Sequence, residues 1–198
     1  MGLFNAGLIV ICQAVRGMNP RLIAGLAMVG LGGAPAMARP WIDPQPVAGT
    51  VMAPADAARI LALHNRERER VGDLPLAWDE ALARNALGWA QELATSGRFE
   101  HSPAGLRGNQ GENLFMGTIG YYPVPAMIGA FLEERSDFAP GVFPAVSRSG
   151  SWHNVGHYTQ VIWRDTRRVG CAIARGRRDD VLVCRYWPAG NVMGQRVP

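Results

Sequence analysis

Two apolar segments near the C-terminus, each carrying one cysteine, constrain the fold more than any other feature of this chain. The first runs from Val169 to Ala174, the second runs from Val181 to Trp187, and a polar, glycine-containing stretch separates them. Short apolar runs rich in β-branched and aromatic residues, joined by a turn-forming loop, predict a β-hairpin with strands at about 169–175 and 181–187.

A third apolar segment, 157–163, precedes the hairpin. Its alternation places His157, Thr159, Val161 and Trp163 on one face, which predicts another strand. A buried strand has no packing use for histidine. His157 therefore belongs either to a functional cleft or to a buried polar network bonded to the backbone, and the segment alone leaves both open.

Helical spacing of apolar residues marks three segments upstream. The first begins near Asp56, a candidate N-cap, and stops at Gly72. The second begins at Asp79 and ends at Ser96-Gly97, and the third covers about 126–138. Helices followed by strands predict an α+β fold, with helices covering an antiparallel sheet.

The N-terminus is typical of an export signal. Arg21 precedes an apolar run, 22–31, and the small residues Ala36-Met37-Ala38 form a cleavage pattern. The run is short and rich in glycine, so we expect no stable transmembrane segment after signal removal. The chain divides into a signal peptide, 1–38, with Met18 as an alternative start, a Pro/Gly-rich linker, 39–54, and a folded domain, 55–198.

Cysteine usage agrees with export to a secreted, extracellular or periplasmic location. The chain has three cysteines, and removal of the leader takes Cys12 and leaves Cys171 and Cys184. An even pair in an exported chain favours a disulfide, which would contribute about 2–3 kcal/mol; two free thiols are the alternative.

Charge argues against a nucleic-acid partner. The formal charge is +4, and it falls to +2 when the two arginines of residues 1–38 are removed. No basic stripe interleaved with aromatic residues is present, so we predict no nucleic-acid binding.

The residues that could carry chemistry are scattered. They include His101 in a loop, His157, Glu112 before an apolar segment, and the neighbours Glu133 and Glu134 on the third predicted helix. Two histidines and two glutamates make a metal or acid/base site only if the fold brings them together. The chain has no His-Glu-x-x-His helix, Gly-x-Ser-x-Gly elbow, Cys-x-x-Cys pair or phosphate loop.

Five motifs in order resemble the CAP superfamily, which comprises cysteine-rich secretory proteins, insect antigen 5 and group-one pathogenesis-related proteins. The motifs are His64-Asn65, Leu76-Ala77-Trp78, His101-Ser102 with Gly111-Glu112-Asn113-Leu114, Gly156 to Trp163, and Cys184-Arg185-Tyr186-Trp187-Pro188 with Gly190-Asn191. The resemblance covers about residues 55–198. It implies a three-layer α-β-α sandwich with a central antiparallel sheet.

The resemblance also implies a cleft lined by a His/Glu tetrad: His101, Glu112, Glu134 and His157. Glu134 is taken over Glu133 because Phe131-Leu-Glu-Glu134 aligns with the family's Trp-x-x-Glu, although Phe131 and Phe138 stand where the pattern has Trp and Tyr. We predict that His101 and His157 bind a divalent metal, with zinc the most plausible. His64 is interpreted as structural and His153 as exposed.

Two functions are candidates, and a third interpretation is an exported domain with a purely structural role. The first is a non-catalytic module that binds a lipid, peptide or protein partner. Residues 121–127 are a candidate hydrophobic groove wall, although ordinary helix packing is the preferred interpretation. The second is a metal-assisted or acid/base hydrolase acting on peptide or cell-wall material, since the tetrad has the groups to activate water. No general reaction is established for the family.

Overall fold

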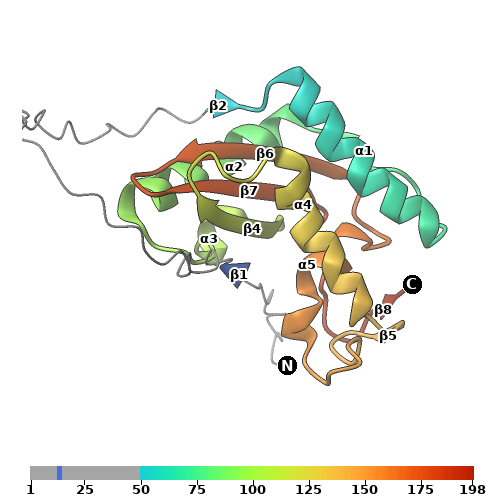
Figure 1. Cartoon of the computed structure of the whole chain (residues 1–198). Coiled ribbons are helices and arrows are strands. Elements are labelled where there is room, and N and C mark those ends of the chain that lie inside the picture. Colours follow the sequence, from blue (N-terminus) through green and yellow to red (C-terminus); the bar gives the residue numbers. More distant parts are fainter. Residues whose placement is uncertain (1–12, 15–49) are drawn as a thin grey trace, which may run out of the picture.

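The cysteine-bearing hairpin forms the centre of the sheet in the computed structural model, which describes residues 13–14 and 50–198 (Figure 1). Its strands are β6 (Arg168–Arg175) and β7 (Asp179–Trp187). Cys171 lies directly opposite Cys184 in the antiparallel register, with their Cα atoms 4.1 Å apart, and the two form a disulfide. The prediction of a bridged hairpin is confirmed.

Shorter strands extend the hairpin on both sides. β4 (Gly111–Thr118) pairs antiparallel with β7, and β2 (Thr50–Val51) pairs antiparallel with β6. β1 (Gln13–Ala14) pairs with β4 and β3 (Ala77–Trp78) with β6, both in parallel. The described strands thus form a six-stranded sheet in the order β1-β4-β7-β6-β2, with β3 off this path.

The predicted leader and linker are only partly covered by the structure. Apart from positions 13–14, the predicted signal peptide, 1–38, and the alternative start Met18 lie outside the described residues, as does the linker up to residue 49. Within the linker range, residues 50–51 form β2, and the first helix begins at Pro54. No described helix is long and apolar enough to cross a membrane.

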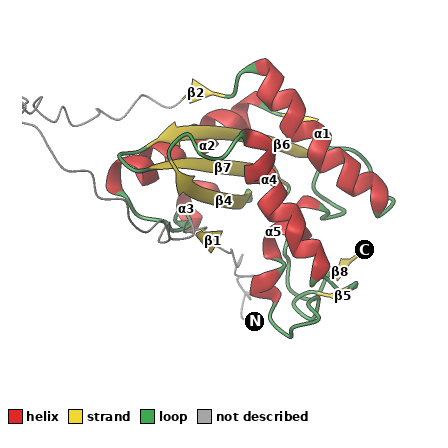
Figure 2. Cartoon of the chain, in the orientation of Figure 1, coloured by secondary structure: helices red, strands yellow, loops and turns green. Residues whose placement is uncertain are grey.

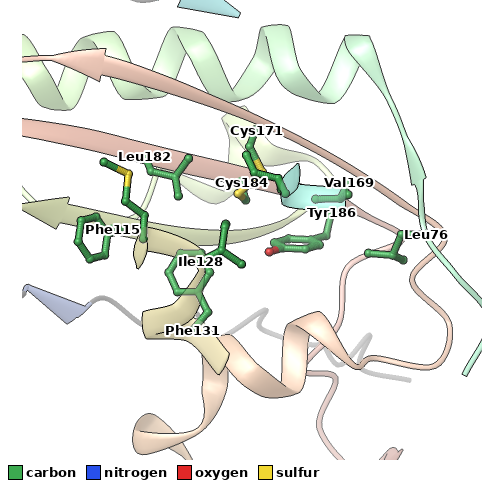
Figure 3. Packing of buried hydrophobic residues seen from close by; sticks show 11 residues of the cluster. Leu76, Phe115, Ile128, Phe131, Val169, Cys171, Leu182, Cys184 and Tyr186 are labelled. Atoms are coloured by element: carbon green, nitrogen blue, oxygen red, sulfur yellow. A yellow bond between two sulfur atoms is a disulfide. The ribbon is translucent and has the colours of Figure 1, made fainter. Parts of the chain in front are cut away.

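Two helices cover one face of the sheet. They are α1 (Pro54–Arg70) and α4 (Val124–Glu133), which lie in front of the strands in Figure 1. Their inward side chains meet those of alternate strand residues in a single buried cluster, part of which Figure 3 shows: Ile60, Met127, Ile128 and Phe131 against Phe115, Leu182, Cys184 and Tyr186. The disulfide is fully buried within this cluster.

One long helix, α2 (Glu80–Ser96), covers the opposite face. Asp79 caps it by accepting hydrogen bonds from the amides of Ala81 and Leu82, and Gly97 ends it with a φ of 68°, both as predicted. Its small inward residues allow a close approach to the strands: a Cβ on Gly170 of β6 would lie 2.3 Å from the Ala83 nitrogen. The predicted three-layer α-β-α sandwich is therefore confirmed.

The predicted strand at 157–163 is wrong, because this segment folds as the short helix α5 (Gly156–Val161). All six of its residues are buried, so neither a two-residue nor a 3.6-residue pattern of burial is present to distinguish the two structures. Glu134 fixes the helix start by accepting hydrogen bonds from the amides of His157 and Tyr158 at 2.9 and 3.0 Å. A contact distant in sequence therefore overrides the strand-like composition.

The other boundaries show two further corrections. Asp56 is not the N-cap of the first helix: α1 begins at Pro54 after Ala53, and Asp56 lies in its first turn. The third predicted helix ends earlier than expected, at Glu133, and continues as a 3₁₀ turn, η1 (Glu134–Ser136). The remaining elements are α3 (Ala104–Arg107), β5 (Gly141–Val142), η2 (Trp152–Asn154) and β8 (Arg196–Val197), as drawn in Figure 2.

A buried arginine joins α1 to the end of α5. The guanidinium of Arg68 donates to the carbonyl oxygens of Leu74, Val161, Trp163 and Thr166 at 2.7 to 3.2 Å. Burial lowers the pKa of Arg68, although the nearby Asp73 carboxylate opposes that effect. Because the helix end and the loop after it have several carbonyls without helical partners, one planar donor group fixes both.

Candidate functional site

His101 and Glu112 form the first of two histidine–carboxylate pairs, in which Glu112 is buried and His101 is partly exposed. Glu112 is the second residue of β4, and His101 lies in the loop before α3. Its Nδ1 is 2.7 Å from Glu112 Oε1. The Ser102 amide and hydroxyl also donate to the Glu112 carboxylate, at 3.0 and 2.8 Å. Since a carboxylate can only accept, His101 donates to Glu112 from Nδ1.

Two arginines that we did not single out from the sequence also face Glu112. Arg185 Nη2 lies 3.0 Å from Oε2 and Arg107 Nη1 lies 3.6 Å from Oε1. Burial alone would raise the pKa of Glu112, but the His101 hydrogen bond and the Arg185 charge outweigh it, so the pKa is lowered. The available sequence signal was Arg185 itself, a charged residue within an otherwise apolar strand.

The second pair joins His157 of α5 to Glu134 of η1. His157 Nδ1 is 2.6 Å from Glu134 Oε1, while Oε2 accepts the two amide bonds at the start of α5. Phe131 stacks on the imidazole, with ring centroids 4.9 Å apart and 14° between planes. His157 Nε2 is buried and has no hydrogen-bond partner among the described residues.

β4 links the two pairs through consecutive residues. Glu112 lies beside Arg185 on the α2 side, whereas Asn113 points to the other side and donates to the His157 carbonyl at 3.1 Å and to the Tyr186 hydroxyl at 3.2 Å. The pairs therefore meet at β4, one residue apart in the strand.

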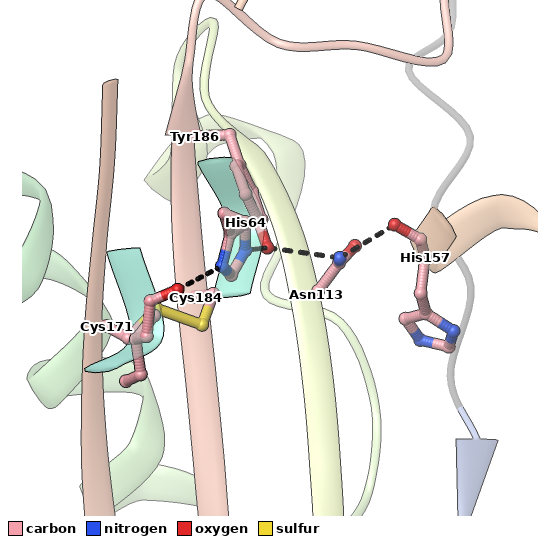
Figure 4. The surroundings of a disulfide bond; sticks show 7 residues. His64, Asn113, His157, Cys171, Cys184 and Tyr186 are labelled. Atoms are coloured by element: carbon pink, nitrogen blue, oxygen red, sulfur yellow. Dashed lines mark hydrogen bonds between the residues drawn. A yellow bond between two sulfur atoms is a disulfide. The ribbon is translucent and has the colours of Figure 1, made fainter. Parts of the chain in front are cut away.

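His64 completes this chain of hydrogen bonds, which Figure 4 shows. Its Nε2 lies 2.9 Å from the Tyr186 hydroxyl, and its Nδ1 lies 2.9 Å from the Ile60 carbonyl oxygen. Burial lowers the pKa of His64 to about 4, so the ring is neutral near pH 7. These contacts agree with a structural role for His64.

The other residues considered from the sequence lie apart from these pairs. Glu133 is exposed, whereas Glu134 is buried against His157. His153 is exposed, as predicted, and stacks on Trp152. The described residues contain no group of three or more His, Cys, Asp or Glu side chains arranged to hold a metal ion.

Comparison with known proteins shows which family this chain belongs to. A model of the CAP family, described as the cysteine-rich secretory protein family, matches residues 61–186. The chain belongs to this family. The matched residues run from α1 to β7 and include both histidine–carboxylate pairs of the CAP domain.

Individual relatives of this CAP domain come from distant organisms. It is similar to pathogenesis-related protein 1C of Nicotiana tabacum, with 34% identity over 68% of this chain and 76% of that protein. It is also similar to the secreted protein RBT4 of Candida albicans, with 37% identity over 70% of this chain and 36% of that protein. A solved structure of NaASP2 with Zn²⁺ shares the fold, with a TM-score of 0.63 and 24% identity over 74% of this chain and 86% of that one.

Proposed function

We propose that this protein is an exported CAP-domain module that binds a divalent cation, zinc most plausibly, through Nε2 of His101 and His157. The observation that carries the proposal is the pairing of each imidazole Nδ1 with a buried carboxylate, while His157 Nε2 is buried without a partner among the described residues. A buried nitrogen of this kind is costly unless something binds it.

The chemistry of the pairs favours a metal. Histidines that bind zinc usually donate their other ring nitrogen to a carboxylate, which fixes the tautomer and makes the ligating nitrogen more basic. Glu112 and Glu134 hold the two imidazoles in this way. A bound zinc would act as a Lewis acid toward a ligand or water at its remaining positions. The structure of NaASP2, which shares the fold of this chain, was solved with Zn²⁺, and this supports the same interpretation.

A binding module is favoured over a hydrolase by how the carboxylates are used. Glu112 accepts from His101 and Ser102 and faces two arginines, and Glu134 accepts three hydrogen bonds. The lowered pKa of Glu112 makes it a weak general base near pH 7, and both oxygens of Glu134 are engaged in holding His157 and the start of α5. We therefore expect no turnover of peptide or cell-wall substrates. Export is supported by the predicted leader, by membership of the cysteine-rich secretory protein family and by similarity to the secreted protein RBT4.

Zinc titration of the purified protein by calorimetry tests this proposal. We expect one zinc per chain in the wild type and loss of binding in His101→Ala and His157→Ala. His153→Ala is the matched control, because His153 is exposed and lies outside both pairs, and it should bind zinc like the wild type. Circular dichroism checks that each variant folds. Wild-type protein that binds no zinc at neutral pH, or binding that survives both substitutions, contradicts the proposal.

A further inference from the structure

A second candidate site lies on the α2 side of the sheet, next to the His101–Glu112 pair. An open pocket of about 670 Å³ is lined by residues of α2, by the loop leading to α3, by Leu106 of α3 and by Arg185 of β7. Its volume falls within the usual range for small-molecule sites of about 300–1,000 Å³.

The charges beneath this pocket are unbalanced. Arg185 is only 2% exposed and Arg107 only 6%, and both face the single carboxylate of Glu112, which also accepts from His101. In each arginine, Nε and Nη1 are buried without a hydrogen-bond partner among the described residues. Two buried guanidinium groups that share one carboxylate leave donors and positive charge for a second anion.

The pocket lining offers both charge and apolar surface. Trp89 and Leu106 provide an aromatic and an aliphatic surface, and Leu106 is 71% exposed. Arg84 is an exposed lining cation, whereas the lining carboxylates Glu92 and Glu100 both pair with Arg98, at 3.1 and 2.9 Å. The lining acids are thus already engaged, and Arg185 is not fully paired.

We infer that this pocket binds a small organic acid, with the ligand carboxylate at Arg185 and its apolar body against Trp89 and Leu106. Guanidinium donors match carboxylates in geometry and charge, and a carboxylate attached to an apolar group would use both kinds of lining.

Gly88 of α2 provides a variant that closes the pocket without disturbing the fold. It lines the pocket, and a Cβ added there meets no atom within 4 Å. Gly88→Phe should therefore fill the pocket while the helix is retained. Gly129→Phe on α4 is the matched control, because a Cβ on this helical glycine also meets no atom within 4 Å and α4 covers the other face.

Calorimetric titration with benzoate tests the inference, carried out on the whole protein in EDTA and at low salt so that zinc plays no part. We expect saturable benzoate binding at least 10-fold tighter than that of the neutral analogue benzamide. Gly88→Phe and Arg185→Met should each weaken it at least 10-fold, and Gly129→Phe should not. Gly88→Phe keeps the test valid if Arg185→Met fails to fold.

Three results overturn the inference. Benzoate that binds no better than benzamide shows that the buried guanidinium donors are satisfied internally, for example by water near Gln110, whose Oε1 is also buried without a partner among the described residues. Inorganic phosphate binding in place of benzoate shows a simple anion site. Unchanged benzoate binding in Gly88→Phe places the ligand elsewhere.

Discussion

At the scale of single residues, Glu134 contributes both to the candidate site and to the local fold. One carboxylate oxygen holds the His157 ring and the other holds the first two amides of α5. The same residue therefore orients a candidate ligand and determines that residues 156–161 form a helix. Glu134 is thus part of the candidate site and also part of the contacts that determine the local fold.

Replacing Glu134 by Ala should destabilise the protein by about 2–4 kcal/mol, because three buried donors lose their acceptor. Urea denaturation measures this loss. Glu133→Ala is the matched control, since Glu133 is exposed one residue away, and it should change stability by less than about 0.5 kcal/mol. Equal losses in the two variants would show that the contacts of Glu134 are not what stabilises α5.

His64 should make stability depend on pH. Its folded pKa of about 4 lies below its ordinary value of 6.5, mainly because of burial, with the charge of Arg68 a smaller cause in the same direction. The unfolded chain thus binds the proton more readily, and the stabilisation, fully present above pH 6.5, is lost as pH falls toward 4. A shift of this size corresponds to about 3 kcal/mol.

Urea denaturation between pH 7 and pH 4.5 measures this slope, and His64→Gln should flatten it. The lower limit of pH 4.5 keeps Glu112 from affecting the measurement. Because the pKa of Glu112 is lowered, its contribution to the free energy of unfolding is lost only as pH falls below 4.5. If the slope in His64→Gln matched that of the wild type, His64 would not be the group responsible.

At the scale of elements, Arg68 connects α1 to the segment after α5. Arg68→Met should cost about 3 kcal/mol or more, since four carbonyl oxygens lose a buried charged donor. Urea denaturation is again the measurement. Arg66→Met, an exposed position on the same helix, should stay near wild-type stability. A small loss in Arg68→Met would mean that water replaces the guanidinium.

Elements with local signals were predicted well from the sequence, and elements without them were not. The limits of α2 follow from the Asp79 cap and Gly97, and the hairpin follows from two apolar runs and a polar loop. α5 has no such signal, because all of its residues are buried and its start is capped by Glu134, more than twenty residues upstream. Arg68 and Arg185 were missed for a related reason: the sequence shows each charge, but neither its burial nor the groups that it contacts.

At the scale of the whole molecule, the order of motifs in the sequence predicted the three-layer architecture. The contacts that link the two histidine–carboxylate pairs could not be predicted and are seen only in the structure. No spacing in the sequence indicates that Glu112 contacts His101 on one face of β4 while Asn113 contacts His157 on the other face. That arrangement depends on β4 lying beside β7, in the register that places Glu112 opposite Arg185.

The disulfide should stabilise the whole molecule. A bridge between residues 13 positions apart contributes about 3 kcal/mol by restricting the unfolded chain. The double variant Cys171→Ala/Cys184→Ala should therefore melt about 6–12 °C lower in a calorimetric scan. Because both sulfurs are fully buried, reducing agent should have little effect on the folded wild type. Rapid reduction under native conditions would show that the layers open readily.

Because Glu112 and Asn113 point to opposite faces of β4, the strand register affects how a refolded sample of this protein should be checked. A chain whose β4 pairs with β7 one residue out of step would have nearly the same helix and strand content, yet the carboxylate and the amide would exchange sides. Circular dichroism would barely distinguish the two products. The correct partner of His101 exists in only one of them, so ligand binding is a more sensitive criterion of a correctly refolded sample than its spectrum.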